Sequence, residues 1–314
     1  MIARPVLEAH HAYVRGDNAW QQRARLHQSL WRQAHGLLAG MHGDKPLGSR
    51  LPPTADAEPP TLSNYLSPQA QHCVEGAVAE APKTGALLGR PRLWVDLLSS
   101  QPLCFNLFGP LAEDHTLAGR VLSMLWPDIR TVNDIRFEWS PGRGDEAYTG
   151  NRSAFDVFVD YDGPLGRSFL GIEVKYHEDL SGRAAKDENG RYTALANKHG
   201  IFREDLVPAL QKPPLQQIWL DHLLALQLRS NPKNDGWKAG TFALLYPVGN
   251  TACADGAARY RRCLTDVETF DARTLDDVVQ AARLTSPASW PDDVYARYLD
   301  PTLVNATIAD PAGA

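Results

Sequence analysis

Long apolar runs are missing from this sequence. No stretch approaches the roughly 18 consecutive apolar residues that span a bilayer, and the opening residues, MIARPVLEAHHAYVRGD, lack the apolar run of a secretory signal. Cysteine is also scarce, with four among 314 residues, no C-x-x-C pair and no histidine at zinc-ligand spacing. We therefore expect a cytoplasmic protein without a membrane segment, disulfide framework or structural zinc site, and with four reduced thiols (Cys73, Cys104, Cys253 and Cys263).

Motifs of several common enzymes are missing as well. The sequence has no G-x-S-x-G nucleophile turn, no Walker A or G-x-G-x-x-G phosphate loop and no H-E-x-x-H zinc motif. A hydrolase with a serine or cysteine nucleophile therefore finds no support. What is present is the composition of an ordinary globular protein, with 43% apolar and 22% charged residues.

An overall excess of positive charge is also absent. The net charge of −5 differs from that of a simple basic nucleic-acid binder, although it does not exclude local basic patches. Residues 1–50 hold seven Lys or Arg against three Asp or Glu, and five of the ten histidines. This asymmetry is a weak indication of phosphate contact near the N-terminus.

The N-terminal part predicts one amphipathic helix followed by a linker. From Asp17 or Asn18 to about Ala39 the apolar residues follow helical spacing, with a polar face opposite them (Gln21, Arg25, Gln28 and Arg32). This face could lie along a nucleic-acid backbone, but we favour a solvated face. Residues 43–61 are rich in Pro and Gly. We therefore expect a helical extension and linker over residues 1–60 and an ordered domain over 61–314.

The ordered part predicts an α/β protein with an antiparallel meander at its centre. Helical patterns cover 67–80, 91–99, 110–126 and 213–229, and a disordered or mobile polar segment is expected at 178–212. Strand patterns cover 132–139, 153–161, 168–176 and 240–248. In the C-terminal part TDVETF predicts a strand, and TLDDVVQAARL and WPDDVYARYL predict helices. This order differs from the regular alternation of doubly wound sheets.

Two neighbouring strands bring three functional side chains together. If Tyr161 pairs with Ser168, then Asp156 lies across from Glu173, and Lys175 projects from the same face beside the small Ala154. Two carboxylates near an apolar core repel each other unless a cation joins them, and oxygen ligands without Cys or His favour Mg²⁺ or Mn²⁺. Such an ion would support phosphodiester hydrolysis. Lys175 could orient or deprotonate the water, or stabilise the phosphorus. The spacing alone is loose, and a surface strand on which Lys175 neutralises two acids is the alternative.

The run SAFDVFVDY followed by LGIEVKYHEDL resembles the PD-(D/E)xK nuclease superfamily, with Phe155 where the name has a proline. SSQPLCFNLFGPL, RFEWSPGR and EVKYHEDL look like a bacterial restriction-endonuclease subgroup. The resemblance implies a restriction-endonuclease-like αβββαβ core over about residues 90–250, with a mixed sheet flanked by helices. It implies catalysis by Asp156, Glu173 and Lys175, with metal bound by the two acids, and accessory roles for four further residues (Glu113, Gln216 or Gln217, and Glu138). Glu138 could equally form a strand-end salt bridge.

Two polar segments could contact nucleic acid. The loop at 140–152 offers phosphate or base contacts (Arg143, Tyr148 and Arg152), and the segment 178–212 carries five further cations (Arg183, Lys186, Arg191, Lys198 and Arg203). Ordinary exposed polarity explains both equally well.

The sequence as a whole predicts a Mg²⁺- or Mn²⁺-dependent endodeoxyribonuclease of restriction type whose partner is DNA. A catalytically silent nucleic-acid-binding or assembly protein that retains the fold is the alternative, although a retired site has no reason to keep two repelling carboxylates. Restriction, repair and RNA processing stay open. A duplex cutter commonly needs two active sites, so a homodimer is one of the oligomeric states left open.

Overall fold

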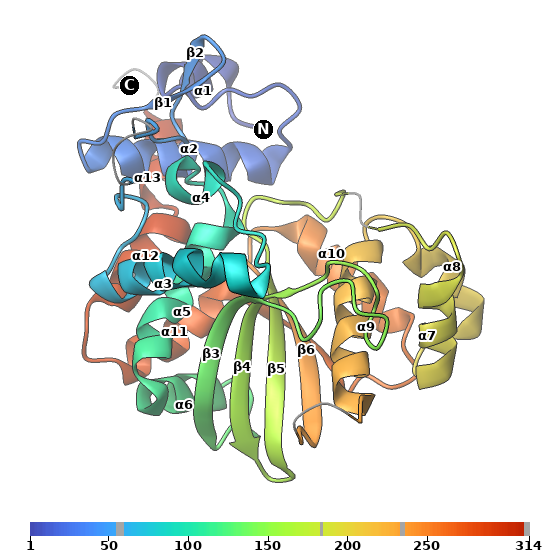
Figure 1. The fold of residues 1–314 in the computed structure, drawn as a ribbon. Coiled ribbons are helices and arrows are strands. Elements are labelled where there is room, and N and C mark those ends of the chain that lie inside the picture. Colours follow the sequence, from blue (N-terminus) through green and yellow to red (C-terminus); the bar gives the residue numbers. More distant parts are fainter. Residues whose placement is uncertain (55–59, 183–184, 233–235, 311–314) are drawn as a thin grey trace.

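A five-stranded mixed sheet forms the centre of the molecule (Figure 1). The computed structural model describes residues 1–54, 60–182, 185–232 and 236–310. The strands stand in the order β3-β4-β5-β6-β7, with the bounds β3 Thr131–Trp139, β4 Phe155–Gly163, β5 Gly166–Val174, β6 Ala239–Tyr246 and β7 Phe270–Thr274. The first three strands are antiparallel neighbours, and β6 and β7 are added in parallel. The expected α/β class and restriction-endonuclease-like core are confirmed.

The predicted register between β4 and β5 is correct. Tyr161 pairs with Ser168, and the ladder runs on in the same register to Val157 and Ile172. It stops there, one residue short of Asp156, where the ring of Phe155 lies over Gly171. A Cβ on Gly171 would stand 2.5 Å from that ring, so the ring packs where only a glycine leaves room for it. The start of β4 and the end of β5 lie at the end of the sheet nearer to α2 (Ala19–Ala34) (Figure 1).

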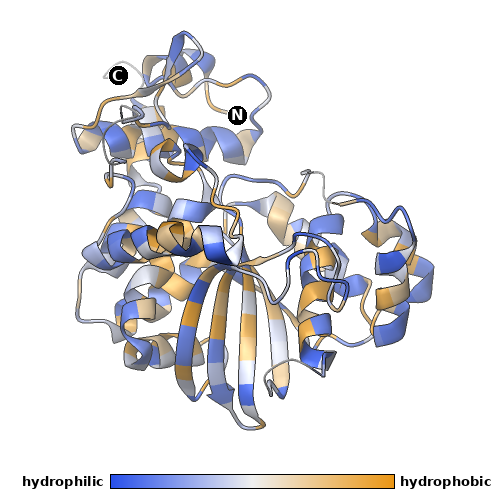
Figure 2. Cartoon of the chain, in the orientation of Figure 1, coloured by the Kyte–Doolittle hydropathy of each residue, from blue (hydrophilic) through white to orange (hydrophobic). Residues whose placement is uncertain are grey.

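Helices cover both faces of the sheet because its side chains alternate. Val157, Val159 and Ile172 pack with one set of helices (α5 Ser100–Glu113, α6 His115–Ser123, α11 Leu275–Thr285 and α12 Trp290–Tyr298). Phe158 and Phe169 face the other set (α7 Arg191–His199, α9 Gln216–Ser230 and α10 Thr251–Arg262). Apolar residues dominate the middle of β4, β5 and β6 (Figure 2). Both faces of the central strands are therefore buried.

Several element boundaries differ from the prediction. The helix expected over 110–126 is two helices, α5 and α6, because Asp114 accepts a hydrogen bond from Leu117 N at 2.9 Å and caps α6. The strand expected at 265–270 is wrong except for its last residue. Residues 267–270 form a turn in which Phe270 N donates to Val267 O at 3.2 Å, and β7 begins at Phe270. Helix α10 was not expected. The long helix α3 spans Pro68–Thr84, and further helices are α4 Arg92–Val95, α8 Val207–Leu210 and α13 Thr302–Ala309.

Three of the four residues on the polar face of α2 are buried and Gln21 is half-buried, so neither a solvated face nor a nucleic-acid contact is correct for most of it. Arg25 is 8%, Gln28 0% and Arg32 5% exposed. Their polar atoms find partners inside the protein: Arg25 bonds Asp17, Gln28 donates to the hydroxyl of Tyr176, and Arg32 donates to a backbone carbonyl. Helix α2 is covered on this side by the segment around the hairpin β1–β2 (Gly40–His42 and Lys45–Leu47) and by the end of β5. The short helix α1 (Arg4–Ala9) precedes it.

The polar segment 178–212 is largely folded, contrary to the expectation of disorder. It contains α7 and α8, and Tyr192 of α7 meets Trp219 of α9 edge to face at 6.2 Å. Arg191 donates to Thr149 O at 3.0 Å, while Lys186, Lys198 and Arg203 are exposed. Arg183 lies outside the described residues.

The cysteines are free thiols, as expected, and Cys104, Cys253 and Cys263 are buried. No helix in the described part of the chain is long and apolar enough to cross a bilayer.

Candidate active site

A cavity of about 510 Å³ opens where β4 begins and β5 ends. Asp156, Glu173 and Lys175 all line it, so the fold brings the three expected residues together. The walls come from α5, α9, the end of β3 and the loops beside them, and include further polar side chains (Arg92, Ser100, Gln101, Glu138, Asn151, Arg152, Ser153, Glu178, Gln217 and Asp221).

Asp156 is fixed by the backbone of the neighbouring strand. Its Oδ2 accepts a hydrogen bond from Val174 N at 2.8 Å, where the regular ladder has already ended. This contact aims the carboxylate between Glu173 and Lys175, which flank Val174 in the chain. Asp156 Oδ1 has no hydrogen-bond donor among the described residues.

Glu173 and Lys175 form a buried pair. Lys175 Nζ donates to Glu173 Oε1 at 2.5 Å, and the two residues are 7% and 6% exposed. Gln217 Nε2, from α9, donates to the same oxygen at 2.6 Å. Glu173 Oε2 has no donor in the described part of the chain. Lys175 N bonds Leu245 O at 2.8 Å, so β6 holds the backbone in place just beyond β5.

The electrostatics of the cavity favour a bound cation. Burial raises the pKa of Asp156 well above its usual value, and the neighbouring charge of Glu173 raises it further. Burial alone would lower the pKa of Lys175, but the surrounding carboxylates outweigh it and raise that pKa. Lys175 is therefore a cation, and the carboxylates outnumber it.

The donor set fits a hard divalent ion. Asp156 Oδ1 and Glu173 Oε2 are carboxylate oxygens without a protein partner, and no cysteine or histidine accompanies them in the cavity. Within the described residues no group of three or more His, Cys, Asp or Glu side chains has the geometry of a metal cage. Two protein carboxylates would therefore share the ion with water and substrate oxygens.

Asp221 is a candidate that the sequence reasoning missed. It is 5% exposed, it lines the cavity from α9, and its buried Oδ2 has no hydrogen-bond partner among the residues that the structure describes. Burial raises its pKa well above the usual range, and Glu173 adds to this. Asp221 follows Gln217 by four residues, so both lie on one face of the helix. A lone acid in the apolar run IWLDHLLAL was the available signal.

Glu138 forms the strand-end salt bridge considered for it, and its expected accessory role in metal binding stays a prediction. It lines the cavity and also forms the strand-end ion pair, with Arg143 Nη2 at 3.0 Å from Oε1. Gln101 Nε2 donates to its other oxygen at 3.4 Å. Its backbone φ is 48°, which marks the sharp exit from β3. Burial raises the pKa of Glu138.

The other expected residues are dispersed. Glu113 does not line the cavity. Its Oε1 instead lies 2.7 Å from His72 Nδ1 on another part of the surface. Gln216 turns to Ala185 O at 3.0 Å, so of the two glutamines Gln217 is the one that reaches Glu173. Tyr148 is buried at 8% exposure. Arg152 is exposed and lines the cavity.

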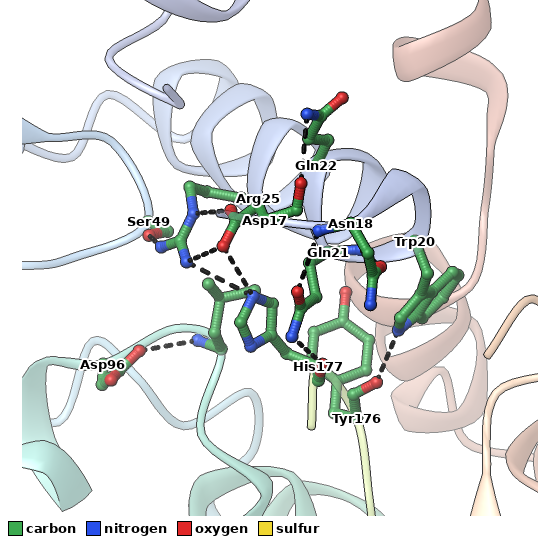
Figure 3. Close-up of polar contacts among 11 residues, drawn as sticks. Asp17, Asn18, Trp20, Gln21, Gln22, Arg25, Ser49, Asp96, Tyr176 and His177 are labelled. Carbon is green, nitrogen blue, oxygen red and sulfur yellow. Dashed lines mark hydrogen bonds and ion pairs between the residues drawn. The ribbon is translucent and has the colours of Figure 1, made fainter. Parts of the chain in front are cut away.

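The chain beyond Lys175 is held by α2 (Figure 3). Trp20 Nε1 donates to Tyr176 O at 2.9 Å, and Gln21 Nε2 donates to His177 O at 3.5 Å. The ring of Trp20 also meets that of Tyr176 edge to face at 6.2 Å. The N-terminal helix therefore contacts the segment that carries the lysine.

A mixed α/β sheet whose adjacent strands present two carboxylates and an amine to one polar cavity is an arrangement typical of metal-dependent hydrolases. The sequence model of the PD-(D/E)XK nuclease superfamily matches residues 15–300, so the chain belongs to this superfamily. The matched range includes α2. No curated protein and no solved structure matches the chain. Membership indicates nuclease-type activity, and nucleases of this superfamily typically use divalent metal ions.

Proposed function

We propose that the protein is a Mg²⁺- or Mn²⁺-dependent DNA endonuclease of restriction type. The observation that carries this proposal is the convergence of Asp156, Glu173 and Lys175 on one cavity, with free oxygens on both acids. The alternative, a silent nucleic-acid-binding protein that keeps the fold, has no comparable observation in its favour. Lys175 is paired with Glu173, which leaves Asp156 as a second buried acid that is costly to ionise without a further cation.

Asp156 and Glu173 would hold the ion, each through the oxygen that the protein leaves free. The bound ion would polarise the phosphoryl group and lower the pKa of a bound water. Gln217 and Lys175 fix Glu173 from two sides, which sets the direction of its free oxygen. The ammonium group of Lys175 lies in the same cavity beside Glu173, so it can orient the attacking water or neutralise charge on a phosphate oxygen.

The test uses the purified full chain with supercoiled plasmid, linear duplex, branched and single-stranded DNA, each with Mg²⁺, Mn²⁺ or EDTA. We expect nicking or linearisation of the closed plasmid with either ion and no cleavage in EDTA. Cleavage of the closed plasmid identifies an endonuclease, because a closed circle has no ends for an exonuclease. Asp156→Asn should abolish cleavage, and Glu75→Gln, which changes an exposed acid on α3, serves as the matched control. If no DNA is cut with either metal while DNA is still bound, the silent binding protein takes precedence.

A further inference from the structure

A second pocket lies beside the active-site cavity. It measures about 370 Å³ and lies between the N-terminal segment and the start of α5. Arg92 and Glu178 line both hollows, and the adjacent residues Ser99 and Ser100 line one each. The two hollows are therefore neighbours that share a wall.

The pocket carries arginines without acidic partners. Arg92 is exposed and Arg50 is half-buried, and neither forms an ion pair within the described residues. Arg50 Nη1 donates only to a backbone carbonyl, that of Met41, at 3.2 Å. Guanidinium groups without a carboxylate partner keep their donors for a ligand.

The acids of the pocket accept hydrogen bonds from other groups, although the charge of Arg50 also acts on Asp96 and opposes the rise of its pKa on burial. Asp96 Oδ1 accepts from Leu98 N at 3.0 Å. Glu178 accepts from Ser100 Oγ at 3.2 Å and from Tyr176 N at 3.0 Å. These bonds hold both oxygens of Glu178 and one of Asp96, and neither acid lies within ion-pair distance of Arg50 or Arg92 among the described residues.

The rear wall is rigid (Figure 3). Arg25 Nε lies 2.6 Å from Asp17 Oδ2, and its Nη1 donates to Ser49 Oγ at 2.9 Å. Arg25 Nη2 also lies 3.3 Å from His177 Nε2. This network ties α2, the segment after β2 and the chain beyond β5 together, so the position of Arg50 is fixed relative to the active site.

We propose that the second pocket binds a backbone phosphate of the nucleic-acid strand that is cut in the active-site cavity, with Arg50 and Arg92 as its contacts. The inference rests on the proposed function, because the shared wall matters only if a strand passes through both hollows. Guanidinium groups match the geometry of phosphate oxygens and hold a strand in place without reading its sequence. The N-terminal segment would then supply part of the substrate site.

The first experiment measures binding without cleavage. Fluorescence anisotropy of labelled single-stranded and duplex oligonucleotides is followed in EDTA and in Ca²⁺ over a range of salt concentrations. The variants are Arg50→Gln, Arg92→Gln and the double variant, and the control is Arg120→Gln. Arg120 is an exposed arginine on α6, which lies at the other end of the sheet (Figure 1). We expect each single change to weaken binding about tenfold and the slope of log K against log salt to fall by about 0.7–0.9 per lost contact.

A second experiment places the contact on the strand. Single methylphosphonate linkages, which are uncharged, are moved along the oligonucleotide. The wild-type protein should lose affinity when the uncharged linkage stands at one or two particular positions other than the scissile linkage. At those positions the uncharged linkage should not change the affinity of the double variant. Affinity and salt slope equal to those of Arg120→Gln would overturn the inference even if the wild type cuts DNA. A wild type that binds no nucleic acid would overturn the proposed function together with it.

Discussion

Asp156 Oδ2 accepts the hydrogen bond of Val174 N at 2.8 Å across the end of the β4–β5 ladder. An asparagine can accept the same bond through its amide oxygen, so Asp156→Asn separates charge from geometry. We expect the variant to fold and to lose cleavage by a factor on the order of 10³ or more, since the ion loses a charged ligand.

The same variant has a second readout in its thermal stability. Burial beside Glu173 raises the pKa of Asp156, so the ionised form destabilises the native state above that carboxyl's usual pKa. In EDTA at neutral pH we expect Asp156→Asn to melt at a higher temperature than the wild type. Mg²⁺ or Mn²⁺ should stabilise the wild type and leave the variant unchanged. Equal metal-induced shifts in both proteins would exclude Asp156 as a ligand.

Asp221→Asn tests the acid on α9. Because Asp221 Oδ2 is buried without a partner in the cavity, we expect a function there, through a metal-bound water or the ion itself. Cleavage and metal affinity should fall about 10- to 100-fold, while stability in EDTA rises because burial raises the pKa of this acid. Metal affinity is measured by titration calorimetry with Mn²⁺. Glu75→Gln is the control, and unchanged affinity in Asp221→Asn would refute the role.

Trp20→Phe tests the hold of α2 on the active site. The change keeps most of the ring and removes the donor to Tyr176 O. We expect a loss of about 1 kcal/mol in the free energy of unfolding and a fall in kcat with little change in KM, because the chain next to Lys175 loosens. Chemical denaturation and steady-state cleavage measure the two effects. An unchanged kcat at lowered stability would make the contact purely structural.

Arg297→Met tests a buried cation without a carboxylate. Arg297 is 0% exposed, its guanidinium lies 4.4 Å from the Trp31 ring centroid, and it donates to Asn64 O at 2.7 Å. Methionine fills part of the space but removes the donor to Asn64 Oδ1, while Asn64 O keeps its hydrogen bond from Asn106 Nδ2 at 3.0 Å. We expect a loss of about 3 kcal/mol in the free energy of unfolding, measured by urea denaturation. Burial lowers the pKa of Arg297. The oxygens of Asn64 and the ring of Trp31 stabilise its positive charge in place of a carboxylate. A loss well below 1 kcal/mol would contradict this account.

His222 predicts a pH dependence of stability. Burial lowers its pKa to about 3, and its ring nitrogens lie 2.8 Å from Tyr260 Oη and 2.9 Å from Thr269 Oγ1. The unfolded chain protonates this histidine near pH 6.5, so its contribution is complete above that pH and is lost as the pH falls towards 3. Between pH 7 and 5 the wild type should lose about 2 kcal/mol more than His222→Gln. Urea unfolding at both pH values measures the difference, and equal losses would disprove it.

The register of β4 and β5 could be predicted because it depends on local information. Phe158 and Val159 are neighbours in the strand, so their side chains point to opposite faces of the sheet. The short loop between the strands leaves few possible registers. Glu173 and Lys175 follow from that register. Asp156 needed the structure, since the ladder ends at Val157 and its carboxylate meets the backbone of Val174 instead of a directly paired residue.

The polar face of α2 could not be judged from its own pattern. A period of 3.6 residues shows which side chains share a face, but it does not show what covers that face. Arg25, Gln28 and Arg32 are buried because segments distant in the sequence supply their partners. The same reason hid Asp221, whose place in the cavity depends on how α9 packs over the sheet.

By itself the sequence determined the succession of the central strands along the chain, the register of β4 with β5, and the common face of Glu173 and Lys175. Those features follow from backbone periodicity and from a single short connection. Only the tertiary structure decided that Gln217 and Asp221 join the site, that Glu113 does not, and that α2 is held against the end of β5. These outcomes depend on contacts between residues far apart along the chain, and such contacts form only when whole elements pack together.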